Sequence, residues 1–106
     1  PVQRSRLMPL VFRPEAQVEL LAAQAWYEER ATGLGFEFAR AVDAAITRAL
    51  RAPLTFPVIE GKFRHVMTRR FPYSVIYRPA GNQLVVVSCF HHRRMPGSWK
   101  PANDGQ

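Results

Sequence analysis

The stretch YSVIYRPAGNQLVVVSCF, residues 73–90, carries the clearest signal of the fold. Its two ends, YSVIYR (73–78) and QLVVVSCF (83–90), are rich in β-branched and aromatic residues, which are typical of strands. The turn residues PAGN lie between them, and a connection this short favours an antiparallel pair. In the second segment the side chains of both faces are apolar, which predicts a central strand covered on each side.

A third strand is predicted just before this stretch, in KFRHVMTRR (62–70), so that the three strands form a meander. Strand alternation assigns the side chains to faces. In the strand over 62–70, one face carries Arg64, Val66 and Thr68, and the other carries Phe63, His65 and Met67. In the last strand, one face carries Val85, Val87, Cys89, His91 and Arg93, and the other carries Leu84, Val86, Ser88, Phe90, His92 and Arg94.

The amino-terminal half predicts two helices joined by a short turn. Pro14-Glu15 is a typical helix start, because proline is favoured at the first helical position and a carboxylate suits the positive end of the dipole. The predicted apolar stripe of the first helix is Val18, Leu21, Ala22, Ala25 and Trp26. After the break TGLG (32–35), the predicted stripe of the second helix is Phe38, Val42, Ala45, Ile46, Ala49 and Leu50. This helix must end near Ala52, because Pro53 disfavours helical geometry in the residue before it.

The order of elements predicts an α+β fold. The segment LMPLVFR (7–13) is a short strand candidate at a sheet edge, and PLTFPVIEG (53–61) is predicted as a loop. The chain is then a strand, a helical hairpin and a three-stranded antiparallel meander, with the helices packed on the sheet. At 106 residues we expect one domain, residues 1–106, with a core over about 7–99 and a loose tail over 100–106.

The net charge of +7 is concentrated in the second half of the chain. Residues 1–60 contain seven basic and seven acidic side chains, whereas 61–103 contain eight basic side chains and no acidic one. Such a block predicts a positive surface that attracts a polyanion or an acidic peptide, although a solubilising surface is the alternative.

Several classes of protein are disfavoured by composition. The sequence contains no stretch that resembles a signal peptide or a membrane span, and its lone Cys89 fits a reducing compartment, so we expect a cytoplasmic protein. Cys89 lies in a predicted strand and is expected to pack in the core.

The stretch CFHHRRMPGSW (89–99) is the first candidate for chemistry. His91 and His92 are adjacent on a strand and point to opposite faces, so they cannot readily chelate one ion, and we expect neither a metal nor another cofactor. RNA cleavage needs two proton-transferring groups and cations for the phosphorane charge. A tentative catalytic set for such chemistry is Arg64, His65, His91 and Arg93. Each histidine can also simply bond a neighbouring carbonyl group.

Aromatic rings are interleaved with the arginines of this half, as in many proteins that bind single-stranded nucleic acid. Phe63, Phe71 and Phe90 are expected in the core, whereas the role of Tyr73 stays open. The candidate contacts to nucleic acid or another target are Lys62, Arg69, Arg70, Tyr73, Arg78 and Arg94.

Three stretches carry a resemblance to a known family: RPEAQVELLAAQAWYEERATGLGFEF (13–38), RRFPYSVIYR (69–78) and VVVSCFHHRRMPGSW (85–99). Over about residues 10–99 the chain resembles the RelE/ParE superfamily of toxins from bacterial type II toxin–antitoxin pairs, most closely the branch labelled plasmid-stabilisation proteins. The resemblance implies a growth-arresting toxin that a cognate antitoxin neutralises. RelE-like members cut messenger RNA on the ribosome, and ParE-like members poison DNA gyrase.

The RelE pattern is incomplete in this sequence. The basic residues of that branch fall near His65 and Met67 and on Ser74, its histidine falls on His91, and its carboxyl-terminal arginine has candidates in Arg93 and Arg94. Met67 and Ser74 cannot supply charge, so the resemblance favours ParE-like inhibition of gyrase. The alternatives are a metal-independent endoribonuclease of the RelE type and a non-toxic binding module.

Two further expectations concern the positive surface. The partner is expected to be an acidic antitoxin segment that is disordered alone and folds on binding. His91 and Arg93 are expected near Arg64 or His65 on one surface. Arg94 is expected to point away or to pair with an acid on a helix.

Overall fold

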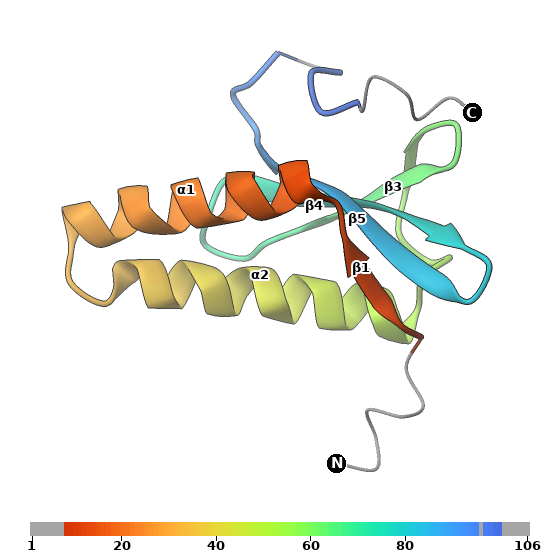
Figure 1. Cartoon of the computed structure of the whole chain (residues 1–106), viewed down its shortest axis with the longest axis horizontal. Helices are drawn as coiled ribbons and strands as arrows, with labels where there is room; N and C mark the ends of the chain where they lie inside the picture. Colours follow the sequence, from red (N-terminus) through yellow and green to blue (C-terminus); the bar gives the residue numbers. More distant parts are fainter. Residues whose placement is uncertain (1–7, 96, 101–106) are drawn as a thin grey trace, which may run out of the picture.

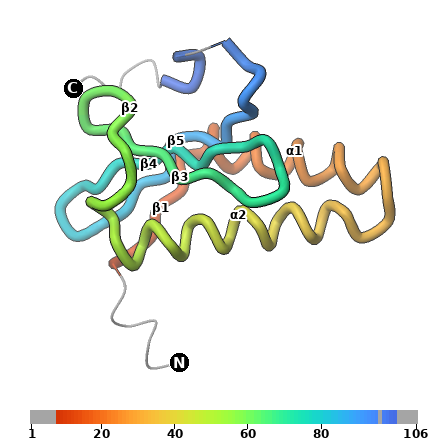
Figure 2. The backbone as a smooth tube through the Cα atoms, turned by 180° about the vertical axis from the view of Figure 1, so that it is seen from behind, coloured from red at the N-terminus to blue at the C-terminus, as the bar shows by residue number. Residues whose placement is uncertain are grey.

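The structure is a computed structural model that describes residues 8–95 and 97–100. Within these residues are two helices and five strands, which form one sheet in the order β1-β5-β4-β3-β2. The elements are β1 (Leu10–Phe12), α1 (Pro14–Arg30), α2 (Leu34–Arg51), β2 (Val58–Glu60), β3 (Phe63–Met67), β4 (Tyr73–Ala80) and β5 (Gln83–His91). The helices run side by side as a hairpin whose connected end extends beyond the sheet (Figure 1 and Figure 2).

The predicted α+β order and the antiparallel meander are confirmed. β3 pairs with β4 and β4 pairs with β5, both antiparallel. β5 is an interior strand, as predicted, because β1 pairs with its other edge. That pairing is parallel and makes the sheet mixed, which the sequence did not predict.

Two predictions at the sheet edge were wrong. The stretch 53–61, predicted as a loop, contains β2, which pairs antiparallel with β3 across the turn at Gly61. All of β2 is exposed, so it lacks the alternation that marks a half-buried strand. The strand predicted over 62–70 ends at Met67, because the backbone N–H of Thr68 turns to the carbonyl oxygen of Tyr73, 2.9 Å away, and closes a loop.

The ends of the chain agree with the predictions only in part. The strand predicted over 7–13 is Leu10–Phe12, and Leu7 lies outside the described residues. Lys100, the first residue of the predicted tail, pairs with Glu60, with 2.7 Å between Nζ and Oε2. Residues 101–106 of that tail lie outside the described part of the chain.

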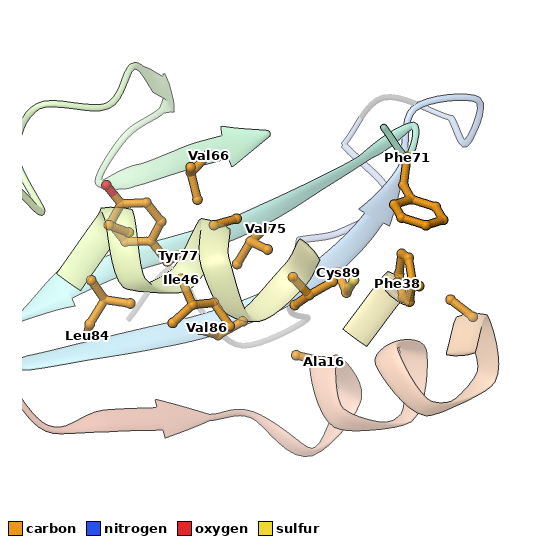
Figure 3. Close-up of a cluster of buried hydrophobic side chains, with 14 residues drawn as sticks. Ala16, Phe38, Ile46, Val66, Phe71, Val75, Tyr77, Leu84, Val86 and Cys89 are labelled. Atoms are coloured by element: carbon orange, nitrogen blue, oxygen red, sulfur yellow. The ribbon is translucent and has the colours of Figure 1, made fainter. Parts of the chain in front are cut away.

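Side chains cover both faces of β5, as predicted. The larger cluster lies between the sheet and the helices and includes Phe38, Val75, Tyr77 and Cys89 (Figure 3). A smaller cluster on the opposite face is built from Phe63, Ile76, Val85, Val87 and Trp99. We call these two sides of the sheet the helix face and the outer face.

A β-bulge changes the alternation of β5. Ile76 of β4 pairs with Ser88, but the next residue, Tyr77, pairs with Val86, so β5 carries one extra residue at this point. Leu84 and Val86 therefore point to the helix face, and so does Cys89 beyond the bulge. The prediction that Cys89 and His91 share a face with Val85 and Val87 was wrong, because one inserted residue reverses the facing of every residue after it.

The predicted stripe of α2 is confirmed, whereas that of α1 was wrong. Phe38, Val42, Ala45, Ile46 and Ala49 of α2 are buried, and Leu50 is half-buried. α1 instead packs through a rotated face of Ala16, Leu20, Ala23 and Tyr27. Its predicted stripe is in solvent, with Val18, Leu21 and Trp26 being 66%, 54% and 52% exposed. α1 has apolar residues on more than one face, so periodicity alone could not choose between them.

Candidate functional site

The outer face carries a pocket of about 480 Å³, which we call the outer pocket. Its polar side chains are Glu60, His65, Ser74, His92 and Arg94. Met67, Ile76, Phe90 and Trp99 contribute apolar surface. β2, β3, β4 and the segment after β5 therefore all contribute to its walls.

Two histidines meet at one serine in the outer pocket. The hydroxyl of Ser74 lies 3.0 Å from Nε2 of His92 and 3.5 Å from Nδ1 of His65. Alternation in the antiparallel β3–β4 pair brings His65 and Ser74 to the same face. Because a hydroxyl has one proton, Ser74 can donate to one ring and accept from the other, which links the two imidazoles in one proton-transfer chain.

Burial keeps one of these rings neutral. Desolvation lowers the pKa of His65, and the nearby charge of His92 lowers it further. A neutral imidazole is able to accept a proton near pH 7. His65 is therefore suited to act as a general base.

We predict that His65 titrates below its ordinary value of 6.5 and makes stability dependent on pH. The unfolded chain takes up this proton at a higher pH than the folded chain does, so the free energy of unfolding falls as the pH is lowered from 6.5 to the folded-state pKa. NMR titration of the ring protons, with urea unfolding between about pH 5 and 8, measures both effects. In His65→Asn the pH dependence should be weaker but not abolished, because the pKa of His91 is also lowered, chiefly by burial. A midpoint for His65 at or above 6.5 would contradict the prediction.

The structure does not bring the four predicted catalytic residues together. Arg64 donates from Nη1 to the carbonyl oxygens of Leu54 and Phe56, at 3.1 and 2.8 Å, and so anchors the loop after α2. His91 packs its ring against Tyr73 on the helix face, with 4.9 Å between centroids, whereas His65 lies on the outer face.

Arg93 is exposed, and its backbone N–H donates to Nδ1 of His91 at 2.9 Å. The expectation that His91 and Arg93 share one surface with Arg64 or His65 was therefore wrong. The bulge in β5 turns His91 to the helix face, away from His65, and His91 pairs with Tyr73 of β4 whereas Arg64 pairs with Tyr77, four residues farther along that strand. The sequence analysis missed His92 as the partner of His65. Both faces of β5 are apolar, so its sequence does not reveal the bulge that turns His92 to the outer face.

The predicted target-binding residues lie at several separate places. Lys62, Arg69 and Arg70 are exposed in turns, and Arg70 pairs with Glu37 of α2 at 2.7 Å. Arg78 is half-buried on β4. Tyr73 packs against Tyr27 and Phe38 on the helix face, where burial raises its pKa. The ring of Tyr73 therefore packs mainly in the core and is not free to contact a target.

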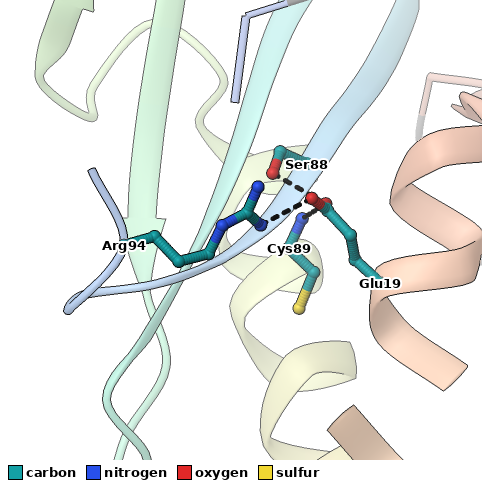
Figure 4. A network of polar contacts seen from close by, with 4 residues as sticks. All are labelled: Glu19, Ser88, Cys89 and Arg94. Atoms are coloured by element: carbon teal, nitrogen blue, oxygen red, sulfur yellow. Dashed lines mark hydrogen bonds and ion pairs between the residues drawn. The ribbon is translucent and has the colours of Figure 1, made fainter. Parts of the chain in front are cut away.

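The prediction for Arg94 is confirmed: it pairs with an acid on a helix. Its Nη1 lies 2.7 Å from Oε2 of Glu19 on α1. The same carboxylate accepts hydrogen bonds from the Ser88 hydroxyl at 2.8 Å and from the Cys89 backbone N–H at 2.9 Å (Figure 4). Glu19 thus joins α1, the bulge of β5 and the segment that follows it.

A second hollow lies on the helix face, beside α1. This helix groove has a volume of about 600 Å³ and is largely apolar. Ala22, Trp26 and Tyr27 of α1 form one wall, and Tyr73 and His91 belong to the other. The exposed apolar side of α1 runs into it at Ala22 and Trp26.

Comparisons with known proteins identify the fold. Neither a family model nor a curated protein matches the sequence. A solved structure described as "Chromosomal ParDE TA system from P. aeruginosa" contains a similar chain, with a TM-score of 0.68 and 16% identity. The match covers 80% of this chain and 96% of that one. The chain has the RelE/ParE-like fold.

In this fold the positions that the RelE pattern predicts to be basic meet in the outer pocket. His65, Met67 and Ser74 all line it, whereas His91, onto which the family's histidine falls, lines the helix groove. Among the described residues, Arg94 is the one arginine or lysine of the outer pocket, and Glu19 neutralises it. The pocket therefore offers two imidazoles but little free positive charge.

Cys89 is buried in the core, as predicted, and burial raises the pKa of its thiol to about 12, so the thiol is inert. Within residues 8–95 and 97–100, no three His, Cys, Asp or Glu side chains are grouped so that they could hold a metal ion. In the same part of the chain, neither helix is long and apolar enough to cross a membrane.

Proposed function

We propose that this chain is the toxin of a bacterial type II toxin–antitoxin pair and that it arrests growth by ParE-like inhibition of DNA gyrase. The observation that carries the proposal is the fold, which is shared over most of both chains with a chain of a ParDE system. The resemblance of RRFPYSVIYR (69–78) and VVVSCFHHRRMPGSW (85–99) to the same superfamily supports it independently.

The outer pocket favours gyrase over messenger RNA as the target. RNA cleavage requires cations that stabilise the charge of the phosphorane. Met67 and Ser74 stand where the RelE pattern has basic residues, and Arg94 already pairs with Glu19. A toxin that acts by binding gyrase needs no such charge.

We predict that induced expression of the chain in bacteria arrests growth. A gyrase poison should produce cleaved DNA complexes and an SOS response while transcripts stay intact. Plating efficiency, DNA cleavage in gyrase reactions and transcript integrity measure the three effects. Substitution of Arg64, His91 and Arg93 by alanine in the same growth assay, after the folding of each variant has been checked, discriminates between a toxin and a non-toxic binding module. Unimpaired growth of the organism of origin would contradict the toxin proposal and favour the alternative of a non-toxic binding module.

A RelE-like endoribonuclease is the second candidate, and the pair of imidazoles on Ser74 favours it. One ring would take the proton of the 2′-hydroxyl, which attacks the phosphorus, and the other would protonate the leaving 5′-oxygen. His92→Ala would then abolish cleavage of ribosome-bound transcripts, whereas His91→Ala on the other face would not. Cut transcripts without an SOS response would replace the gyrase proposal with this one.

The partner is proposed to be a co-encoded acidic antitoxin that covers the exposed side of α1 and the helix groove. The exposed side chains of Val18, Leu21 and Trp26 form an apolar surface on α1. Exposed apolar patches of this kind mark sites where a partner binds. The surplus of eight basic and no acidic side chains over 61–103 suits an acidic segment.

We predict that Trp26→Glu weakens binding of the antitoxin by about thirtyfold or more, because an aromatic anchor at the centre of an interface is worth at least about 2 kcal/mol. Phe36→Glu is the matched control, since Phe36 is also a largely exposed aromatic residue but lies on α2. Calorimetric titration of the purified pair measures both. Equal affinities for wild type and Trp26→Glu would show that the antitoxin binds elsewhere.

A further inference from the structure

The bulge in β5 determines which face of the sheet His91 and His92 each occupy. Beyond it, His92 reaches Ser74 on the outer face and His91 packs on Tyr73 at the helix face. Adjacent residues in a strand point to opposite faces. Without the extra residue, His91 would instead follow Val85 and Val87 to the outer face.

The bulge also creates polar groups that need partners. Ser88 is 1% exposed, and the Cys89 N–H donates to a side chain on α1. A buried donor that loses its acceptor destabilises the fold, because water does not replace the lost hydrogen bond. The bulge is therefore stable only while something accepts these two hydrogen bonds.

Glu19 is that acceptor. Its Oε1 accepts hydrogen bonds from both the Ser88 hydroxyl and the Cys89 N–H, at 2.8 and 2.9 Å. Its Oε2 accepts a hydrogen bond from the guanidinium of Arg94. The neighbouring carboxylates of α1 are engaged elsewhere: Glu15 pairs with Arg13, and Glu28 accepts from the backbone N–H groups of Gly33 and Gly35.

We infer that Glu19 is a positioning residue: by accepting the Ser88 and Cys89 hydrogen bonds it holds the bulge that sends His92, rather than His91, to Ser74 and His65. The role depends on where the acceptor oxygen lies and not on the charge of Glu19. It goes beyond the proposed function, because it concerns the geometry of the outer pocket in the isolated protein, whichever target the chain has.

Two substitutions separate the position of the oxygen from the charge. Glu19→Gln keeps an acceptor oxygen at the same reach but loses the charge. Glu19→Asp keeps the charge, but its side chain is one methylene shorter and cannot reach the bulge. Arg94→Ala is the matched control, because it removes the ion pair and leaves the two hydrogen bonds to the bulge.

The experiment is NMR of the purified full chain. The readouts are the nuclear Overhauser contact between the ring of His92 and Ser74, the titration of His65, and hydrogen exchange of the Cys89 amide. In Glu19→Asp we expect the contact to be lost, the pKa of His65 to move toward 6.5 and the Cys89 amide to exchange about tenfold faster or more. Glu19→Gln and Arg94→Ala should behave like the wild type in all three.

The opposite pattern would overturn the inference. If Glu19→Asp keeps the His92–Ser74 contact while Glu19→Gln and Arg94→Ala lose it, the ion pair and not the acceptor position holds the segment. If all three variants keep the contact, Glu19 does not position His92. Neither result bears on whether the chain is toxic, so failure here is distinguishable from failure of the proposed function.

Discussion

Replacement of Phe38 by alanine is expected to lower the free energy of unfolding by about 3–5 kcal/mol. Phe38 on α2 is fully buried and packs against the rings of Tyr27, Phe71 and Tyr73, with centroids 4.9–5.3 Å apart. These three rings come from α1, the β3–β4 turn and β4, and Figure 3 shows Phe38 beside Phe71. Truncation would leave a cavity where three parts of the chain meet, and the loss is a large fraction of the stability of a small domain.

Urea unfolding of Phe38→Ala and Phe36→Ala measures this effect. Phe36 lies two residues away on the same helix but is 63% exposed, so its truncation should change stability by no more than about 0.5 kcal/mol. The comparison controls for the change in helix propensity, which is the same at both positions. Similar losses in both variants would mean that Phe38 is not the centre of the core.

Replacement of Gly35 by alanine is expected to destabilise the chain by about 1–3 kcal/mol, because it overpacks the joint between the helices. A Cβ at Gly35 would lie 2.6 Å from the carbonyl oxygen of Gln24 and 3.0 Å from Cβ of Glu28. The first contact is with backbone, so α1 and α2 would have to separate. Separation would also weaken the hydrogen bond from the Gly35 N–H to Glu28.

The sign of the Gly35→Ala effect is the test. Alanine is favoured over glycine inside a helix by about 1 kcal/mol, so propensity alone predicts a gain in stability. Ala44→Gly on the exposed side of α2 measures that propensity and should cost about 1 kcal/mol. Thermal or urea unfolding of both variants decides the matter, and a more stable Gly35→Ala would show that the helices do not approach so closely.

The sequence predicted some residues of the candidate site but not how they are arranged. Strand alternation correctly placed His65 and Met67 together on one face of β3, and the pairing of Arg94 with a helical acid was also correct. His92 was not recognised, and His91 was assigned to the wrong face, because both depend on the bulge between Val86 and Ser88. The bulge is held by Glu19, which is remote in the sequence, so no local pattern of residues predicts it.

The sequence by itself determined the elements whose signal is local. Pro14 and Pro53 mark helix boundaries through their own covalent geometry, α2 has a single apolar side, and the segments 73–78 and 83–90 flank a short turn that forces an antiparallel pair. Only the tertiary structure decided the rest. Four features depend on contacts between residues far apart in the chain. They are the parallel pairing of β1 with β5, the choice of the buried face of α1, the formation of the exposed strand β2, and the faces to which His91 and His92 point. In each of these cases two arrangements satisfy the local pattern equally well, and the packing of one element on another selects between them.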